Sequence, residues 1–367
     1  FMSIQQPNIR FSRKLDADFN KTLRQRVNAY FADEKLGKKG NYKMYLKTAI
    51  MLSLYLVPFA LMLTGVITNK WIMLGMAPLM GIGVAGIGLS VMHDANHGAY
   101  SNKNWVNRII GYTLNLLGGN AFNWKMQHNT LHHTYTNIDG MDEDLETIPL
   151  LRFSPHAKRI NLHRFQYIYA WFFYGLMTLS WALFKDFRQI YTYHKKGLFK
   201  LYNTSLKKEL PFLIASKVFY YGFILALPMI FMEITFLQWL TGFLVMHFVA
   251  GIILAMIFQP AHIVADNIFP KPDETGNMED NFLAHQMKTT INFGNNNKLL
   301  NWYAGGLNFQ IEHHLFPNVC HIHYKQLAPI VKETAREFNL PYHEIPTFRG
   351  AIAAHSNMLK KLGNEIA

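Results

Sequence analysis

The chain has 367 residues, of which half are hydrophobic and only 16% are charged, whereas a soluble domain carries about a quarter charged residues. This composition excludes an ordinary soluble enzyme and favours a membrane protein. The formal net charge of +13 suits an anionic membrane surface or an acidic partner. Because no nucleic-acid-binding module is recognisable, nucleic acid is not an expected partner. The single cysteine, Cys320, cannot form a disulfide within the chain and leaves the redox compartment open.

Two apolar runs near the N-terminus predict a transmembrane hairpin. Residues 46–67 carry one charge, Lys47, at the edge of the run, and residues 71–92 contain no ionisable side chain. A hydrocarbon core about 30 Å thick is crossed by roughly 20 apolar residues in a helix. The second helix is expected to continue beyond the bilayer through His97 and to stop at Gly98.

Histidine-rich motifs lie at the ends of apolar sequence. They are His93-Asp94-Ala95-Asn96-His97 (box 1), His128-Asn129-Thr130-Leu131-His132-His133 (box 2) and Gln310-Ile311-Glu312-His313-His314 (box 3). Residues three and four apart share one face of a helix, so each box can direct two side chains to one point. Neutral imidazole is the commonest protein ligand for first-row transition metals, and the boxes therefore predict metal binding. The acidic patch after box 2 is interpreted as solvated surface; it contains Asp139, Asp142, Glu143, Asp144 and Glu146.

Further apolar runs follow box 2, at residues 165–184, 212–232 and 234–258. The boxes can meet on one side of the membrane only if an even number of crossings separates box 2 from box 3. The last two runs are therefore predicted to form a second hairpin, and the first, rich in Tyr and Trp, is expected to lie along the membrane surface. Lys217 can snorkel to the interface. His247, in the middle of the last run, is either hydrogen-bonded inside the bundle or functional.

The charge distribution gives an orientation. The two tight turns contain one basic residue, Lys70, and nearly all other Lys and Arg lie on the side of the boxes, which the positive-inside rule makes the cytosol. The predicted fold is an all-α integral membrane protein with four transmembrane helices in two hairpins, interfacial helices and a cytosolic helical cap that carries the boxes. The expected segments are a cytosolic N-terminal part (1–45), hairpin 1 (46–92), a cytosolic and interfacial part with boxes 1 and 2 (93–211), hairpin 2 (212–258) and a cytosolic part with box 3 (259–367).

The number of histidines in the boxes predicts more than one metal. They offer seven imidazoles, whereas a single zinc needs three or four protein ligands. Imidazole without thiolate suits iron, copper or zinc, and the residues alone leave the metal open. A metal pair beside a membrane suggests a lipid substrate. A hydrocarbon chain has no carbonyl to polarise and no acidic proton, so removing hydrogen from it calls for a redox metal and an oxidant such as dioxygen.

In order and spacing, the boxes resemble those of the integral-membrane fatty acid desaturases, and the glutamine that opens box 3 resembles the subgroup that includes front-end desaturases. The likeness covers most of residues 46–324. It implies two irons held by nine ligands, of which the boxes match eight: His93, His97, His128, His132, His133, Gln310, His313 and His314. His262 matches the position of the family's ninth histidine. Gln310 departs from the all-histidine pattern, which leaves open whether it binds iron directly or through water.

Other polar residues near the boxes are candidates for holding the ligands in place, because a ligating imidazole usually donates its other N–H to a carboxylate or carbonyl. These candidates are Asp94, Asn129, His285 and Glu312. Each can instead be an ordinary packed or exposed polar residue. The remaining histidines outside the apolar runs are interpreted as surface or packing residues; they include His156, His163, His194, His321 and His323.

The resemblance also implies a reaction. Two electrons and dioxygen remove hydrogen from adjacent methylenes of a fatty acyl chain, carried as acyl-CoA or acyl-lipid, and leave a cis double bond and water. The electrons are expected from an external ferredoxin or a b-type cytochrome with its reductase, since the chain contains no His-Pro-Gly-Gly haem motif, flavin fingerprint or cysteine cluster. The expected location is the bacterial inner membrane or the endoplasmic reticulum, with membrane lipid around the hairpins and the site facing the cytosol.

Other functions fit the same motifs. A fatty acid or lipid hydroxylase on the same diiron scaffold is the close alternative, because box spacing hardly separates the two outcomes. A membrane metal transporter or a bis-histidine haem protein belongs to a different class. A transporter places its ligands within the helices, whereas these boxes lie at helix ends, and haem would give a Soret band.

Overall fold

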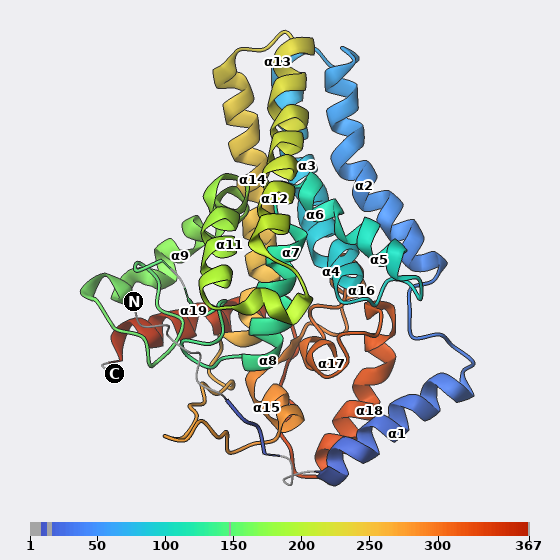
Figure 1. Ribbon diagram of the computed structural model, residues 1–367, viewed down its shortest axis with the longest axis vertical. Coiled ribbons are helices and arrows are strands. Elements are labelled where there is room, and N and C mark those ends of the chain that lie inside the picture. Colours follow the sequence, from blue (N-terminus) through green and yellow to red (C-terminus); the bar gives the residue numbers. More distant parts are fainter. Residues whose placement is uncertain (1–8, 13–16, 147, 366–367) are drawn as a thin grey trace.

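The computed structural model describes residues 9–12, 17–146 and 148–365, and these are largely helical (Figure 1). Within them, four helical rods are long and apolar enough to cross a membrane: Tyr42–Leu63, Lys70–Asn96, Leu206–Phe231 and Phe236–His262. Each overlaps one of the four predicted transmembrane runs. A further pair of segments, Asn161–Gly175 and Met177–Lys195, passes the same test only as a pair and is bent by 51°.

The first two rods lie side by side. They consist of α2 (Tyr42–Leu63) and of α3 (Lys70–Gly86) continued by the π-helix η1 (Ile87–Val91) and by α4 (Met92–Asn96). Asn41 and Asn69 begin the rods, because each side-chain oxygen accepts hydrogen bonds from backbone N–H groups of the first turn. The second rod ends at Gly98, whose φ of +70° is the left-handed conformation common at helix C-termini. The predicted extension of this helix into box 1 is confirmed.

The other two rods form the second pair. They consist of α12 (Leu206–Tyr221), the π-helix η6 (Gly222–Ala226) and α13 (Leu227–Phe231), followed by α14 (Phe236–His262). Thr235 and Gln238 form a capping box at the start of α14. The turns of both pairs lie at the same end of the molecule (Figure 1), where Lys70 Nζ donates a hydrogen bond to the backbone carbonyl of Glu233.

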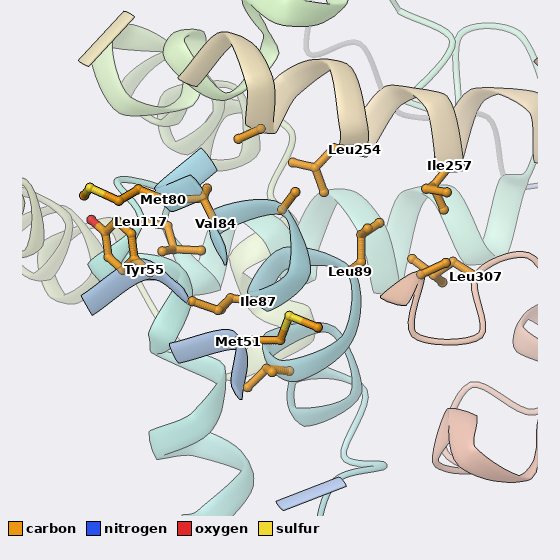
Figure 2. Packing of buried hydrophobic residues seen from close by; sticks show 14 of the residues in the cluster. Met51, Tyr55, Met80, Val84, Ile87, Leu89, Leu117, Leu254, Ile257 and Leu307 are labelled. Carbon is orange, nitrogen blue, oxygen red and sulfur yellow. The ribbon is translucent and has the colours of Figure 1, made fainter. Parts of the chain in front are cut away.

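Helix α14 packs so closely against α3 that the backbones of the two helices are in near contact. A Cβ atom added to Gly81 in α3 would lie 2.6 Å from the carbonyl oxygen of Met246 in α14. Such close approach through small residues is common where helices associate in membranes. Apolar side chains fill the space beside this contact, with Val84 of α3 near Leu254 of α14 (Figure 2). Helix α14 thus packs centrally among the rods, and its last residue, His262, lies at the polar end of the molecule.

Short helices connect the two pairs of rods. After box 1 come α5 (Asn104–Gly111), α6 (Thr113–Leu116), α7 (Ala121–Trp124), the π-helix η2 (Lys125–His132) and α8 (His133–Tyr135). Then follow η3 (Asn161–Phe165), α9 (Gln166–Gly175), α10 (Met177–Ser180), the π-helix η4 (Trp181–Lys185), α11 (Asp186–Lys195) and η5 (Leu198–Tyr202). The aromatic run at residues 165–184 lies in this bent segment and packs along α14. Its place at the membrane surface stays a prediction.

The rest of the chain covers box 3. Its elements are α1 (Ala17–Asp33), α15 (Phe282–Thr289), β1 (Asn292–Phe293), α16 (Lys298–Tyr303), α17 (Gln310–Leu315), η7 (His321–His323), α18 (Tyr324–Glu337), β2 (Glu344–Ile345) and α19 (Phe348–Asn364). Strands β1 and β2 pair in parallel, with Asn292 opposite Glu344. The apolar face of α1 packs on α18, and all of α17 is buried.

Two polar residues of the rods lie inside the protein. The prediction that Lys217 snorkels is wrong: its buried Nζ donates to Asp186 Oδ2 at 2.7 Å and to the Gly118 carbonyl at 2.6 Å. A buried carboxylate on a neighbouring segment offers this lysine a closer partner than the interface. His247 is hydrogen-bonded inside the bundle, as one of its two predicted roles required: its ring lies 2.8 Å from Tyr220 Oη and 3.0 Å from Thr178 Oγ1.

Candidate metal centre

The three boxes meet at the end of the rods away from the turns (Figure 1), on α4, on η2 with α8, and on α17. Box 2 is wound as a π-helix, a wider turn that is frequent at functional sites. The rings of His128 and His132 stack there, with centroids 5.3 Å apart and planes 20° apart. Segments separated by up to about two hundred residues in the chain are thereby brought to one buried place.

One group combines residues from all three boxes. It consists of His93, His97, His128 and His313, whose facing ring nitrogens all lie within 4.8 Å of one another. The Nε2 atoms of His93 and His128 are 3.1 Å apart. All of the rings are buried except that of His97, which is half-buried. Four imidazoles at this spacing match the ligand requirement of one metal ion. We call this set the first group.

A second group lies beside the first. It consists of His132, His262 and His314, whose facing nitrogens are again within 4.8 Å of one another. His133 lies between the groups: its Nε2 is 2.9 Å from His313 Nε2 of the first group, and its ring centroid is 4.3 Å from that of His314 of the second. All eight histidines predicted as ligands therefore lie in one cluster. The boxes do not act as units, since His128 belongs to the first group and His132 to the second.

Gln310 completes the second group. Its amide nitrogen lies 2.8 Å from His262 Nε2 and 3.4 Å from His314 Nε2, while its Oε1 has no hydrogen-bond partner. A half-turn of the amide directs the oxygen to the same point, and an amide oxygen can bind a cation. Direct binding of metal by Gln310 stays a prediction.

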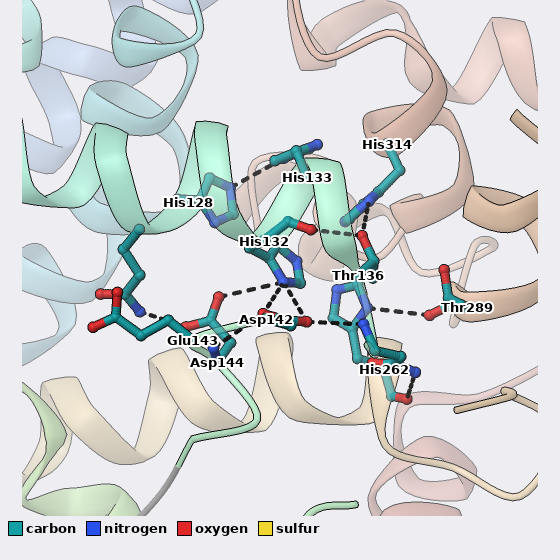
Figure 3. Close-up of polar contacts among 12 residues, drawn as sticks. His128, His132, His133, Thr136, Asp142, Glu143, Asp144, His262, Thr289 and His314 are labelled. Carbon is teal, nitrogen blue, oxygen red and sulfur yellow. Dashed lines mark hydrogen bonds and ion pairs between the residues drawn. The ribbon is translucent and has the colours of Figure 1, made fainter. Parts of the chain in front are cut away.

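The second group is held from behind by hydrogen-bond acceptors. His132 Nδ1 lies 3.1 Å from both carboxylate oxygens of Asp142, and His262 Nδ1 lies 3.3 Å from the Thr289 carbonyl (Figure 3). His314 Nδ1 lies 2.6 Å from Gln286 Oε1. An acceptor at Nδ1 requires the proton on that nitrogen, so each Nε2 carries a lone pair directed inward. Three lone pairs then converge in a buried space.

The inward-facing atoms fit a metal ion. Among the described residues, Nε2 of His97 and of His132 are buried without a hydrogen-bond partner. Burial of unpaired polar atoms is unfavourable, whereas a cation in each group would bind the lone pair of that group's unpaired nitrogen. An all-imidazole set with an amide oxygen and no thiolate suits iron. The residues present therefore fit two metal ions.

Electrostatics favour the neutral, ligating form of most rings. Burial lowers the pKa of His128, His133 and His313 well below the ordinary histidine value, so these imidazoles are uncharged at neutral pH. His132 differs: burial acts to lower its pKa, but the carboxylates of Asp142 and Asp144 together outweigh burial and the pKa is raised. An adjacent carboxylate makes an imidazole a stronger electron donor to a metal.

The residues predicted to hold the ligands make other contacts. Asp94 comes nearest to its predicted role, with Oδ1 3.9 Å from His93 Nδ1, but its Oδ2 accepts from His321 Nδ1 at 2.8 Å. The other ring nitrogen of His321 lies 2.6 Å from Lys47 Nζ. His321 is thus a packing histidine between two buried charges, and the ammonium of Lys47 disfavours a cation at that place.

Three further candidates contact the backbone or distant side chains rather than a ligand ring. Asn129 Nδ2 donates to the Asn96 carbonyl at 2.9 Å, and His285 Nε2 lies 2.9 Å from the Thr136 carbonyl. The buried carboxylate of Glu312 accepts from the side chains of Asn292 and Tyr342, both at 2.8 Å; burial raises its pKa to about 7. These contacts fix the segments that carry the boxes.

Sequence reasoning missed the groups that contact the rings from behind. The interpretation of the acidic patch as solvated surface is wrong for Asp142, whose side chain is 1% exposed and faces His132. Glu143 of the same patch accepts hydrogen bonds from Gln189 and Tyr193. The closeness of Asp142 to box 2 in sequence, together with the preference of ligating histidines for carboxylates, was the available signal. Gln286 gave none.

Comparisons with known proteins agree with this geometry. A model of the fatty acid desaturase family matches residues 69–346. The sn-1 linoleoyl-lipid 6-desaturase of Synechocystis sp. is 36% identical, over 97% of this chain and 98% of that protein. A protein of the same name from Arthrospira platensis is 36% identical, over 94% and 92% respectively. The acyl-lipid (8-3)-desaturase of Physcomitrium patens is 34% identical, over 94% and 72%. The chain therefore belongs to the fatty acid desaturase family of membrane oxidoreductases.

Proposed function

We propose that this chain is a dioxygen-dependent diiron desaturase that inserts a cis double bond into the acyl chain of a membrane lipid, between the carboxyl end and an existing double bond. The observation that supports it most directly is the convergence of eight imidazoles, in two groups with His133 beside them, at the end of four apolar rods. The printed names of relatives that align over nearly the whole chain, linoleoyl-lipid 6-desaturases, support the acyl-lipid substrate and the front-end position.

The balance of the reaction sets what the protein must provide. An acyl CH2–CH2 unit, dioxygen, two electrons and two protons give CH=CH and two water molecules. Two irons, when bound, supply the redox chemistry with dioxygen. The histidines of both groups, together with His133, would hold them, with Gln310 as the candidate ninth ligand. The carboxylate of Asp142 fixes the tautomer of His132, and the Gln286 amide fixes that of His314.

Aromatic side chains close the cluster toward the apolar part of the molecule. The ring of Trp124 lies 4.4 Å from that of His128, and the ring of Phe258 lies 5.2 Å from that of His132, measured between centroids. These rings exclude water from the rods' side of the cluster, and water exclusion protects a reactive centre from side reactions. An acyl chain is expected to approach from this side, because methylene groups favour apolar contacts.

We also propose that the boxes face the cytosol and that an external carrier supplies the electrons. The positive-inside rule supports the orientation, since Lys70 is the only basic residue in the two turns. A ferredoxin or b-type cytochrome with an acidic surface would complement the net charge of +13.

The test is expression in a host with a simple fatty-acid profile that is supplied with linoleate. Gas chromatography with mass spectrometry should show a triene whose new double bond lies between the carboxyl group and the first existing one. The His132→Ala variant should yield none of it. The purified protein should contain two irons per chain and show no Soret band.

Other products distinguish the alternatives. An added hydroxyl group in place of a double bond would replace the desaturase assignment with a hydroxylase on the same scaffold. A Soret band would indicate a haem protein, and the absence of iron with retained metal transport would indicate a transporter.

A further inference from the structure

We propose that Asp142 is the positioning residue for one of the two metals, so that its loss weakens the second group and spares the first. This inference rests on the proposed diiron centre. It assigns a role to a carboxylate that is not itself a predicted ligand, and it makes the two metal sites unequal in how they are held.

The carboxylate of Asp142 is held in place by backbone hydrogen-bond donors. Its Oδ2 accepts from the backbone N–H of Asn137 at 2.9 Å, and its Oδ1 accepts from the backbone N–H of Asp144 at 3.0 Å. Both oxygens also lie 3.1 Å from His132 Nδ1 (Figure 3). A buried anion with two backbone donors cannot rotate away from the imidazole. It therefore sets both the tautomer and the orientation of the His132 ring.

The loop that carries Asp142 also supports the other members of the second group. Asn137, which has a φ of +59°, donates through Nδ2 to the carbonyl of His262 at 3.1 Å. Thr136 Oγ1 donates to Gln286 Oε1 at 3.0 Å, the same oxygen that His314 Nδ1 approaches. One loop, residues 136–144, thus contacts the ring of His132, the ring of His314 and the backbone of His262.

The first group has no equivalent support. Nδ1 of His93 has no hydrogen-bond partner within the residues that the structure describes, and the nearest carboxylate oxygen, on Asp94, is 3.9 Å away. His313 Nδ1 lies 3.3 Å from Tyr324 Oη, a neutral group. The first group therefore depends on four imidazoles, whereas the second has three imidazoles, an amide and two carboxylates, those of Asp142 at 3.1 Å and Asp144 at 3.4 Å from His132 Nδ1. Asp142 is the nearer carboxylate and the one whose two oxygens both face the ring, so its removal should weaken the second group and spare the first.

The experiment measures iron retention rather than activity. Wild-type protein and Asp142→Asn are loaded with ferrous iron without oxygen, and iron per chain is measured during exposure to a ferrous chelator. Asparagine keeps the shape but loses the charge, and its NH2 group faces a backbone N–H. We expect one of the two irons to leave about 10- to 100-fold faster than in wild type, while the other leaves at the wild-type rate.

Matched controls come from the same loop. Glu143→Gln removes the adjacent carboxylate, which contacts Gln189 and Tyr193 instead of a histidine, and Asp139→Asn removes an exposed one. Both should release iron as wild type does. Asp142→Glu, which keeps the charge, should hold the second iron more tightly than Asp142→Asn, and it serves as the test if the asparagine variant fails to fold.

The outcomes separate this inference from the proposed function. Wild-type protein that binds two irons, together with an Asp142→Asn variant that releases both at the wild-type rate, would overturn only the role of Asp142. If Glu143→Gln released iron as fast as Asp142→Asn, the role of Asp142 would also be overturned, because the effect would then come from the loop as a whole. Wild-type protein that binds no iron would overturn the proposed diiron centre itself.

Discussion

Buried histidines occur in this protein in two different environments. His247, within the rods, and His355, in α19, use both ring nitrogens in hydrogen bonds to protein groups: Tyr220 and Thr178 for His247, Tyr174 and the Ile263 carbonyl for His355. In the cluster, His97 is half-buried and His132 fully buried, and each has a buried Nε2 without a partner. Buried unpaired nitrogens also occur on His285 and His323. The candidate ligands are therefore distinguished by ring nitrogens that lie within 4.8 Å of those of other histidines.

The largest expected effect follows from removing a cluster ring. His128→Ala should lower desaturation by more than about 100-fold, since even residues behind a ligand contribute 10- to 100-fold to metal affinity or activity. Iron per chain should fall, as measured by elemental analysis of the purified protein. Full iron content with intact activity would contradict the assignment of His128 to the first group.

His355 gives a test of the structural class by pH. Burial lowers its pKa to about 4, below the ordinary value of about 6.5. Between these values the unfolded chain binds more protons than the folded one, so stability falls as the pH drops from about 6.5 to about 4. The difference of about 2.5 units corresponds to about 3 kcal/mol at 1.36 kcal/mol per unit. The fall of the unfolding midpoint in detergent between pH 7 and pH 5 should be smaller in His355→Gln than in wild type.

An exposed histidine provides the matched control for that measurement. His194→Gln should leave the pH dependence of wild type unchanged, because the side chain of His194 is exposed to solvent. Equal pH dependence in wild type and His355→Gln would show that burial of His355 does not contribute to acid sensitivity.

His247 should give the smallest effect. His247→Leu leaves the hydroxyl groups of Tyr220 and Thr178 without their ring partner, which costs about 1–3 kcal/mol of stability. Iron per chain should remain that of wild type, and His247→Gln, which keeps a hydrogen-bonding side chain, should lose less stability. Loss of iron from a folded His247→Leu protein would instead place this residue in the functional class.

The apolar runs were sufficient to predict the four rods, because the thickness of a bilayer fixes the length of a crossing helix. Residues 46–67 and 234–258 each fall largely within one observed rod. The same pattern could not predict that Lys217 pairs with Asp186, since the two residues lie on different segments and no periodicity relates them. Nor could it predict the π-helical winding of box 2, which depends on contacts with other segments rather than on local propensity.

The candidate ligands were predicted more completely than their support. The boxes have a fixed spacing, and the resemblance to the desaturases extended the set to His262, which the structure places beside His132 and His314. The contact of Gln286 with His314 and that of Thr289 with His262 arise only when α15 packs against box 3 and the end of α14. Such contacts join residues by tertiary structure, and the sequence contains no spacing rule for them.

The mixed origin of the first group has a consequence for biosynthesis. His93 and His313 belong to one group and are 220 residues apart (313 − 93). At translation rates of about 5–20 residues per second, box 3 emerges roughly 10–40 s after box 1. During this interval the histidines of boxes 1 and 2 lack His313, the remaining member of the first group. Under the proposed diiron function, iron insertion must follow the synthesis of most of the polypeptide, and a chain that stalls before α17 would lack His313 and His314.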